Sequence, residues 1–210
     1  HSIDCPEPVF GLAVNGIVEI PNLKKNSTAL PGADLYLTKA IGVGILSTAQ
    51  KKGLLKPGDA AIALKSMVTL NKAGEIFGKT DGVLALTDVT GFGLLGHLSE
   101  LCEGSNCAAD IEFDKIPQLT GLQEYLDLQC IPGGAVRNFK SYGHKIAAMD
   151  DTRRNILCDP QTSGGLLVAV NPDASPAFSN LLRKLGFGAA HCTPFGRLKE
   201  AGDGALITVR

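Results

Sequence analysis

The sequence lacks several features that mark specialised classes of protein. Its net charge is −1 and both signs are interspersed, so no basic surface for nucleic acid or for an anionic membrane is indicated. Its longest apolar runs, such as Leu166–Val170, are far shorter than the ~20 residues of a transmembrane helix, and no signal peptide is evident. We also find no internal repeat and no low-complexity tract. We therefore expect neither membrane nor direct nucleic-acid partners.

No C-x-x-C motif occurs among the six cysteines. Cys102 and Cys107 are close in sequence, but they lack a second pair or nearby histidines, which disfavours a structural zinc site. A chain of this length is too large for a disulfide scaffold, so we expect reduced, mostly buried thiols and a cytoplasmic protein. The chain also begins at His1 without an initiator methionine, and we expect it to be a fragment.

The 210 residues are enough for one substantial domain with a small appendage. Strand formers suggest an extended segment over residues 9–20 without a nearby partner, and the proline-punctuated residues 21–31 are typical of a linker. We place a domain boundary there. Beyond it, apolar periodicity predicts the remaining elements. These are a strand within 33–39, a helix over 40–52 closed by Gly53, helices over 60–70 and 71–77, a strand at 108–113, helices over 121–128 and 171–185, and a terminal hairpin of 190–198 with 205–209.

The most informative stretch is residues 84–101, LALTDVTGFGLLGHLSEL. The apolar run before Asp88 predicts a buried strand, and leucines at helical spacing predict a helix that begins near Phe92 or Gly93. Asp88 then stands at the carboxyl end of a strand, beside a helix N-terminus that favours phosphate. A carboxylate beside phosphate is a typical magnesium ligand, so Asp88 is the metal candidate. The alternative is that Asp88 or Thr90 merely caps the helix.

A different interpretation follows from the glycines of the same turn. Gly91, Gly93 and Gly96 form G-x-G-x-x-G after a predicted strand, and Asp110 or Asp114 follows about twenty residues on. This pattern is typical of a dinucleotide-binding oxidoreductase, but a glycine-rich turn at any strand-to-helix crossover satisfies most of it. We keep it as a secondary hypothesis.

Two further segments are chemically suggestive. Residues 131–145, IPGGAVRNFKSYGHK, are predicted to form a long loop that either contacts a ligand through polar side chains or is simply solvated. Those side chains belong to Arg137, Asn138, Lys140 and His144.

Residues 158–170, CDPQTSGGLLVAV, place a compact polar turn before an apolar strand. Its Asp159, Thr162 and Ser163 belong either to a backbone nest for an anion or to ordinary turn chemistry.

Four motifs, HSID-x-PEP-x-FGLAV, LTDVTGFGLLGHLSE, PGG-x-x-RNF-x-SYGH and LCDPQTSGGLL, together resemble the selenophosphate synthetase family, also called selenide, water dikinases. The resemblance runs over nearly the whole chain and demotes the dinucleotide hypothesis. It implies a superfamily shared with aminoimidazole ribonucleotide synthetase, in which an N-terminal ATP-binding α/β domain precedes a C-terminal α/β domain. The expected fold is therefore α/β, a mixed sheet with packed helices, over residues 31–210. Residues 1–30 would be a remnant strand of the N-terminal domain with its linker.

The resemblance also implies an activity. A cytoplasmic homodimer converts ATP, selenide and water to selenophosphate, orthophosphate and AMP, and it requires Mg²⁺. By this resemblance His1 and Ser2 match the end of a nucleotide-contacting segment, and Asp88 matches a magnesium-binding aspartate. Thr90, Gly91, Asp159, Thr162 and Ser163 are expected close to the site.

The departures from the family pattern limit this expectation. The family's nucleophilic cysteine or selenocysteine, its nearby lysine and two further magnesium-binding aspartates would lie upstream of His1, and Cys5 does not replace them. Asn15 also stands where the family would have threonine. Phosphoryl transfer requires several groups to neutralise charge, so we expect the parent protein to be the enzyme and this chain alone to be inactive. The remaining alternative is a non-catalytic folding or dimerisation module that associates through the strand at residues 9–20.

Overall fold

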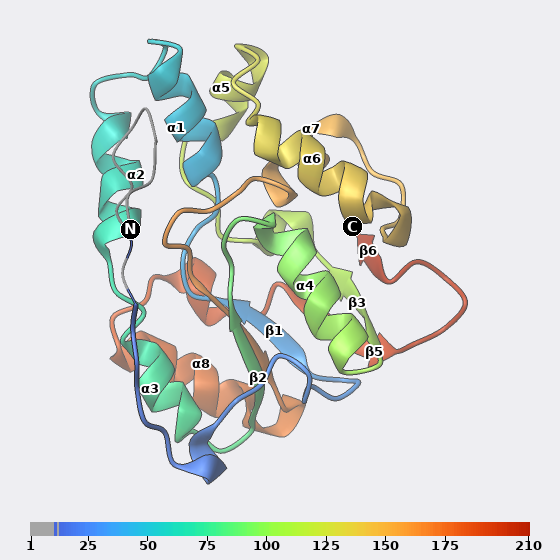
Figure 1. Cartoon of the computed structure of the whole chain (residues 1–210). Coiled ribbons are helices and arrows are strands. Elements are labelled where there is room, and N and C mark those ends of the chain that lie inside the picture. Colours follow the sequence, from blue (N-terminus) through green and yellow to red (C-terminus); the bar gives the residue numbers. More distant parts are fainter. Residues whose placement is uncertain (1–10, 12) are drawn as a thin grey trace, which may run out of the picture.

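The computed structural model describes residue 11 and residues 13–210, which form a sheet with helices on both faces (Figure 1). The six strands run in the order β2-β4-β1-β5-β3-β6. Each neighbouring pair is antiparallel except β3 and β6, which are parallel, so the sheet is mixed as predicted. The strands are β1 (Asp34–Leu37), β2 (Val83–Asp88), β3 (Cys107–Ile111), β4 (Leu166–Val170), β5 (Gly196–Glu200) and β6 (Ile207–Val209).

The helices occur mostly where apolar periodicity predicts them. Gly53, with φ of +70°, follows α1 in the left-handed conformation expected after a helix end. The α-helices are α1 (Val43–Lys51), α2 (Asp59–Val68), α3 (Ala73–Gly78), α4 (Gly93–Gly104), α5 (Leu122–Asp127), α6 (Gly133–Tyr142), α7 (Asp151–Leu157) and α8 (Ser175–Lys184). Short 3-10 turns are η1 (Ile20–Asn22), η2 (Phe113–Lys115), η3 (Gly143–Lys145), η4 (Pro172–Ala174) and η5 (Ala189–Cys192). No helix within residues 13–210 is long and apolar enough to cross a membrane.

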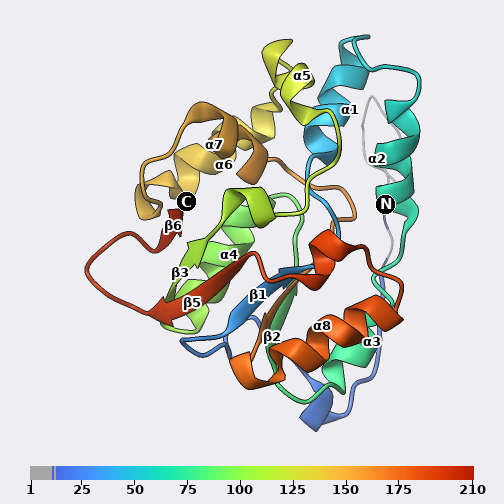
Figure 2. The same ribbon diagram turned by 180° about the vertical axis from the view of Figure 1, so that it is seen from behind.

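Two hydrophobic cores lie on opposite faces of the sheet. Along β4, Leu167 and Ala169 belong to the larger core, whereas Val168 and Val170 belong to the smaller one. This alternation is the period of two that a strand imposes, and both faces are buried because each has its own helices. Helix α4 covers one face in Figure 1, and α8 with α3 covers the other in Figure 2. Phe178 of α8 anchors the smaller core, with its ring centroid 5.0 Å from that of Tyr36.

The predicted C-terminal hairpin is wrong. β5 and β6 are not paired with each other, because β3 lies between them and bonds to both. Residues 201–206 instead form a wide loop that leads from β5 to β6, which lies on the other side of β3 (Figure 2). The local sequence predicts the two strands, but it does not show that each of them pairs with β3.

The N-terminal extended segment forms no strand in its described residues, 11 and 13–20, so the predicted unpaired strand is wrong there. Val14 and Ile17 are 90% and 102% exposed. The following segment lies against the outer edge of β2, where the Leu86 nitrogen donates to the Lys25 carbonyl over 3.3 Å. Thr28 Oγ1 donates to the Leu84 carbonyl over 2.7 Å. Residues 25–28 therefore cover the free edge of the sheet.

Residues 131–145 are not a long loop. They form α6 and η3, with Ala135, Asn138 and Tyr142 buried on one side of the helix. The prediction failed because the buried face contains a polar residue and the first turn contains two glycines, which weaken the helical apolar pattern. A polar residue on a buried helix face calls for a hydrogen-bonding partner.

Candidate functional site

Two segments far apart in the sequence meet at one edge of the sheet. These are the turn after β2, residues 89–92, and the segment before β4, residues 158–165. The Val89 nitrogen donates to the Gly165 carbonyl over 2.8 Å, and the Gln161 nitrogen donates to the Thr90 carbonyl over 3.0 Å. A Cβ at Gly164 would lie 1.8 Å from the Val89 carbonyl oxygen, so only glycine permits this approach. The sheet edge therefore brings Asp88, Thr90 and Gly91 close to the segment containing Thr162 and Ser163.

Asp88 is the last residue of β2 and is exposed. Its carboxylate makes no hydrogen bond or ion pair with the described residues, so it does not cap α4. Within residues 13–210 no group of three or more histidine, cysteine, aspartate or glutamate side chains could hold a metal ion. Magnesium usually takes one or two protein carboxylates and fills its other positions with water and phosphate oxygens, so Asp88 fits the role of a single protein ligand.

Thr90 is linked to a buried histidine that the sequence analysis did not single out. Its Oγ1 lies 3.2 Å from His97 Nε2. His97 Nδ1 lies 3.2 Å from Glu100 Oε2, although this contact lacks hydrogen-bond geometry and leaves Nδ1 without a partner among the described residues. His97 and Glu100 are three residues apart on α4, and this helical spacing is a sequence signal for their contact. The contact with Thr90 has no such signal, because Thr90 precedes the helix.

Asp159 is fully buried and supports the segment from inside. Its Oδ2 accepts hydrogen bonds from the Gly44 nitrogen over 2.9 Å and from Gln161 Nε2 over 2.8 Å. Gln161 Oε1 accepts from the nitrogens of Gly42 and Val43 over 3.1 and 3.2 Å. Asp159 and Gln161 thus satisfy the first nitrogens of α1, the role that a helix N-cap would otherwise play. Burial raises the pKa of the Asp159 carboxyl to about 7.

Ser163 is exposed and adopts a left-handed conformation with φ of +52°. Lys39 Nζ holds its carbonyl oxygen at 2.6 Å, and Asn71 Nδ2 holds the Gly164 carbonyl at 2.9 Å. These bonds fix the backbone of the turn from one side and leave the side chains of Thr162 and Ser163 exposed to solvent.

Helix α6 fastens both segments. Asn138 Nδ2 donates to the Gly91 carbonyl over 2.8 Å and to the Cys158 carbonyl over 3.0 Å. The Tyr142 hydroxyl donates to the Phe92 carbonyl over 2.6 Å. Asn138 therefore acts on the backbone of the site, whereas Arg137, Lys140 and His144 are exposed and make no hydrogen bond or ion pair with the described residues of the two segments. His1, Ser2 and Cys5 lie outside the described residues.

The glycines of the G-x-G-x-x-G pattern meet packing requirements. A Cβ at Gly93 would lie 2.7 Å from the Cys158 carbonyl carbon, and one at Gly96 would lie 2.9 Å from the Tyr142 ring. In a dinucleotide fold the strand before the glycines is part of a parallel sheet. Here β2 pairs with antiparallel β4, and three strands separate it from β3, which carries Asp110. The geometry does not match a dinucleotide site.

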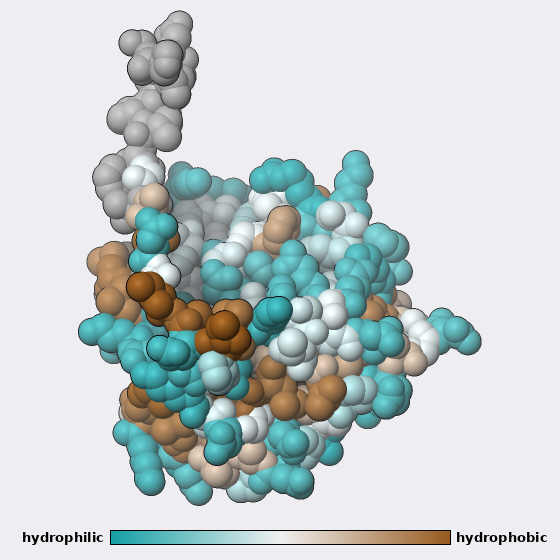
Figure 3. All heavy atoms as spheres, turned by 60° about the horizontal axis from the view of Figure 1, so that its bottom comes forward, coloured by the Kyte–Doolittle hydropathy of each residue, from teal (hydrophilic) through white to brown (hydrophobic). Residues whose placement is uncertain are grey.

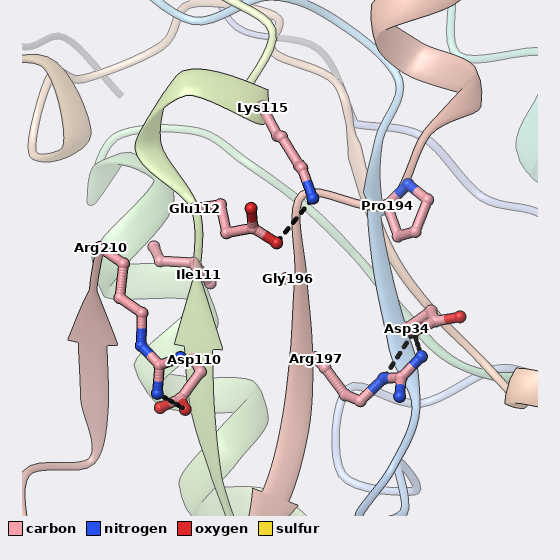
Figure 4. A pocket seen from close by; sticks show the side chains of 9 residues that line it. All are labelled: Asp34, Asp110, Ile111, Glu112, Lys115, Pro194, Gly196, Arg197 and Arg210. Atoms are coloured by element: carbon pink, nitrogen blue, oxygen red, sulfur yellow. Dashed lines mark hydrogen bonds and ion pairs between the residues drawn. The ribbon is translucent and has the colours of Figure 1, made fainter.

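A separate pocket of about 580 Å³ is lined by residues of the neighbouring strands β1, β5 and β3 (Figure 4). Its charged side chains form ion pairs with one another. Arg197 lies 2.7 Å from Asp34, Arg210 lies 2.9 Å from Asp110, and Lys115 lies 2.7 Å from Glu112. The charges in this pocket are therefore balanced. None of its lining residues belongs to the two segments, 89–92 and 158–165, that meet beside Asp88.

Comparison with known proteins agrees with this architecture. The family described as AIR synthase related protein, C-terminal domain, matches residues 31–208. The chain is 54% identical over 209 residues to a selenide, water dikinase of Pseudomonas putida, covering 100% of this chain and 60% of that protein. A selenide, water dikinase of Pasteurella multocida is 52% identical over 211 residues, covering 100% and 59%. The chain thus spans about 60% of the length of these relatives.

Solved structures share the fold at low sequence identity. Thiamine-monophosphate kinase from Stenotrophomonas maltophilia has a TM-score of 0.63 at 19% identity, over 89% of this chain and 52% of that one. The hydrogenase maturation protein HypE has a TM-score of 0.60 at 17% identity, over 89% and 50%. The sequence match and the shared fold lead to the same conclusion: the chain belongs to the family of AIR synthase related proteins, and residues 31–208 form the C-terminal domain of that family.

Proposed function

We propose that the chain is the C-terminal part of a selenide, water dikinase. This enzyme would convert ATP, selenide and water to selenophosphate, orthophosphate and AMP. The observation that carries the proposal is identity of 52–54% across the whole chain to proteins of that name. ATP as the substrate is supported further by a structural neighbour described as HypE in complex with ATP, with a TM-score of 0.56 and 16% identity.

In this proposal the exposed edge at Asp88 faces the nucleotide phosphates. Asp88 would supply one ligand to Mg²⁺, whose chemical role is to neutralise charge on the phosphates. Thr90, Gly91, Thr162 and Ser163 would border the phosphates with backbone and hydroxyl groups. The bonds from Asn138 and Lys39 would hold these groups in place before the substrate arrives, since phosphoryl transfer depends mainly on positioning.

The chain alone would be inactive. Asp88 is a single carboxylate, and the resemblance assigns the nucleophilic cysteine or selenocysteine, its lysine and two more aspartates to an N-terminal ATP-binding domain. We propose that this domain belongs to the same protein, with the boundary near residue 30, and that His1 and Ser2 contact the nucleotide. A cytoplasmic homodimer is proposed on the same resemblance.

Selenide-dependent formation of AMP from ATP tests the proposal. We expect the full-length protein to form AMP and orthophosphate in equal amounts with magnesium present, and the 210-residue chain to form neither. AMP formation by the chain alone would contradict its proposed inactivity. A full-length protein that hydrolyses ATP equally with and without selenide would contradict the proposed reaction.

A non-catalytic association module is the second candidate, and one observation favours it. Val14, Ile17 and Ile20 are 90%, 102% and 86% exposed. Hydrophobic groups also gather toward the left side of the face shown in Figure 3. Several exposed apolar residues within one short segment are typical of a surface that another chain or domain covers. Size-exclusion chromatography with light scattering tests this candidate, and a strict monomer at high concentration would contradict self-association.

A further inference from the structure

Two adjoining pockets beside the carboxyl end of β1 are rich in basic groups. Their volumes are about 620 and 430 Å³, and they share Thr38, Lys65, Thr69 and His191. Lys72 lines the larger pocket and Lys39 lines the smaller one, whereas no aspartate or glutamate lines either. We call the two together the basic double pocket. None of its lining residues belongs to the turn after β2.

Lys39 is a buried ammonium without a counter-charge. Its Nζ donates to the carbonyls of Ser66, Thr69 and Ser163 over 3.2, 2.6 and 2.6 Å. No carboxylate of the described residues forms an ion pair with it, and burial lowers its pKa. Buried charges in proteins are normally compensated by an opposite charge. An anion in the adjoining pocket would compensate this positive charge by electrostatic attraction at a distance. It would not accept a hydrogen bond from Lys39, because the three ammonium protons already have partners.

Lys65 and Lys72 differ from Lys39 because their ammonium groups remain available. Both are exposed, and neither makes an ion pair or hydrogen bond with residues 13–210 through its side chain. His191 Nδ1 lies 2.9 Å from the Leu37 carbonyl. A carbonyl only accepts, so Nδ1 carries the proton in this contact, which fixes the ring of His191 in the wall of both pockets.

The larger pocket also has an apolar wall. It consists of Leu70, Ile76, Leu185 and Phe187, of which Leu70 is 69% exposed. A wall of this kind favours a ligand with an organic body, because a bare inorganic anion would gain nothing from it. The volume of about 620 Å³ lies within the usual range for small-molecule sites.

The pocket in Figure 4 provides the contrast. There every cationic side chain has its own carboxylate, whereas in the basic double pocket Lys39, Lys65 and Lys72 have none among the described residues. We propose that the basic double pocket binds a small organic phosphate, with its phosphate between Lys65 and Lys72 and its apolar body against Leu70 and Phe187. Lysine is a common phosphate ligand as a point charge.

Isothermal titration calorimetry of the 210-residue chain with phenyl phosphate and with inorganic phosphate, at constant ionic strength, tests this site. We expect saturable one-to-one binding of both probes, with phenyl phosphate bound several-fold more tightly. The double variant Lys65→Gln/Lys72→Gln should weaken both by at least about tenfold. Lys79→Gln is the matched control, because Lys79 is an exposed lysine that already pairs with Glu75 at 2.8 Å, and it should change affinity by less than about twofold.

A second variant tests the contribution of the apolar wall to binding independently of the lysines. Leu70→Ser should remove the preference for phenyl phosphate and leave inorganic phosphate unaffected. The absence of saturable binding, or equal affinity in the double lysine variant and the wild type, would overturn the site. A phenyl preference that survives Leu70→Ser would overturn the proposed orientation. No ATP or selenide is used, so this result is independent of the proposed dikinase activity.

Discussion

The backbone nitrogen of Val89 donates a hydrogen bond to the carbonyl oxygen of Gly165 over 2.8 Å. This bond ties the residue after Asp88 to the start of β4, on which Asp88 is paired with Leu166. The position of Asp88 therefore depends on the segment at residues 158–165 as much as on its own strand.

Gly164→Ala should disrupt this junction. The added Cβ would lie 1.8 Å from the Val89 carbonyl oxygen, and backbone on both sides must shift to make room. We expect a loss of about 3 kcal/mol or more in the free energy of unfolding, measured by urea denaturation. Gly188→Ala is the control, because a Cβ there meets nothing within 4 Å and the backbone is extended. Equal stabilities for the two variants would show that the junction is not tightly packed.

Asn138→Ala should destabilise the same junction, although Asn138 is distant in sequence from the turn after β2. It removes the donor that satisfies the carbonyls of Gly91 and Cys158, both at the junction. The expected loss is about 2 kcal/mol in the same denaturation measurement, since one buried and one partly buried acceptor lose their partner. The adjacent Arg137→Ala removes an exposed side chain and should stay within about 0.5 kcal/mol. A neutral Asn138→Ala would contradict the role given to this amide.

Asp159 should make stability depend on pH. Its pKa is raised from the ordinary 3.8 to about 7, so the folded chain keeps a proton that the unfolded chain loses between these values. The resulting stabilisation is complete below pH 3.8 and is lost as the pH rises to about 7. At about 1.4 kcal/mol per pH unit, the upper limit of this loss is roughly 4 kcal/mol.

Asp159→Asn stays neutral and should remove this loss. We expect the stability of the variant, relative to the wild type, to increase as the pH rises from 4 toward 7 in urea titrations at each pH. Asp203→Asn, in the exposed connection between β5 and β6, should show no such trend. If the Asp159→Asn difference is constant with pH, the carboxyl is ionised throughout and the assignment is wrong.

Asp88→Asn should separate function from stability. The side chain is exposed and has no partner among the described residues, so unfolding of the 210-residue chain should change by less than about 0.5 kcal/mol. In the full-length protein the same change should reduce AMP formation and raise the magnesium concentration needed for half-maximal rate. Asp81→Asn, another exposed aspartate, serves as the control. Unchanged magnesium dependence would remove Asp88 from the proposed site.

The sequence predicted those elements whose apolar pattern is local. β2, α4 and the place of Asp88 at the strand end follow from short runs and helical spacing, and the structure has them where predicted. The partner of β5 did not follow, because strand pairing is decided by contacts between distant segments. α6 was missed because its buried face contains Asn138.

Only the exposed residues of the candidate site could be predicted from the sequence. Asp88 is an exposed carboxylate at a turn, which a motif can indicate. Asp159 belongs to a similarly polar turn but is buried under α1, and nothing in its neighbours along the chain distinguishes the two. His97 lies within a leucine-rich helix, and its contact with Thr90 depends on the curve of the preceding turn. Burial and backbone geometry, which the sequence does not show, therefore distinguish the candidate metal ligand Asp88 from the supporting residues Asp159 and His97.

The cover that residues 25–28 place on β2 has a practical consequence for protein production. Unpaired main-chain groups at a sheet edge are templates for association with other chains. A version of the domain that begins at residue 31 would match the family boundary, yet it would lose the carbonyl of Lys25 and the hydroxyl of Thr28. We expect such a version to aggregate at concentrations where one beginning at residue 22 stays dispersed, as dynamic light scattering would reveal.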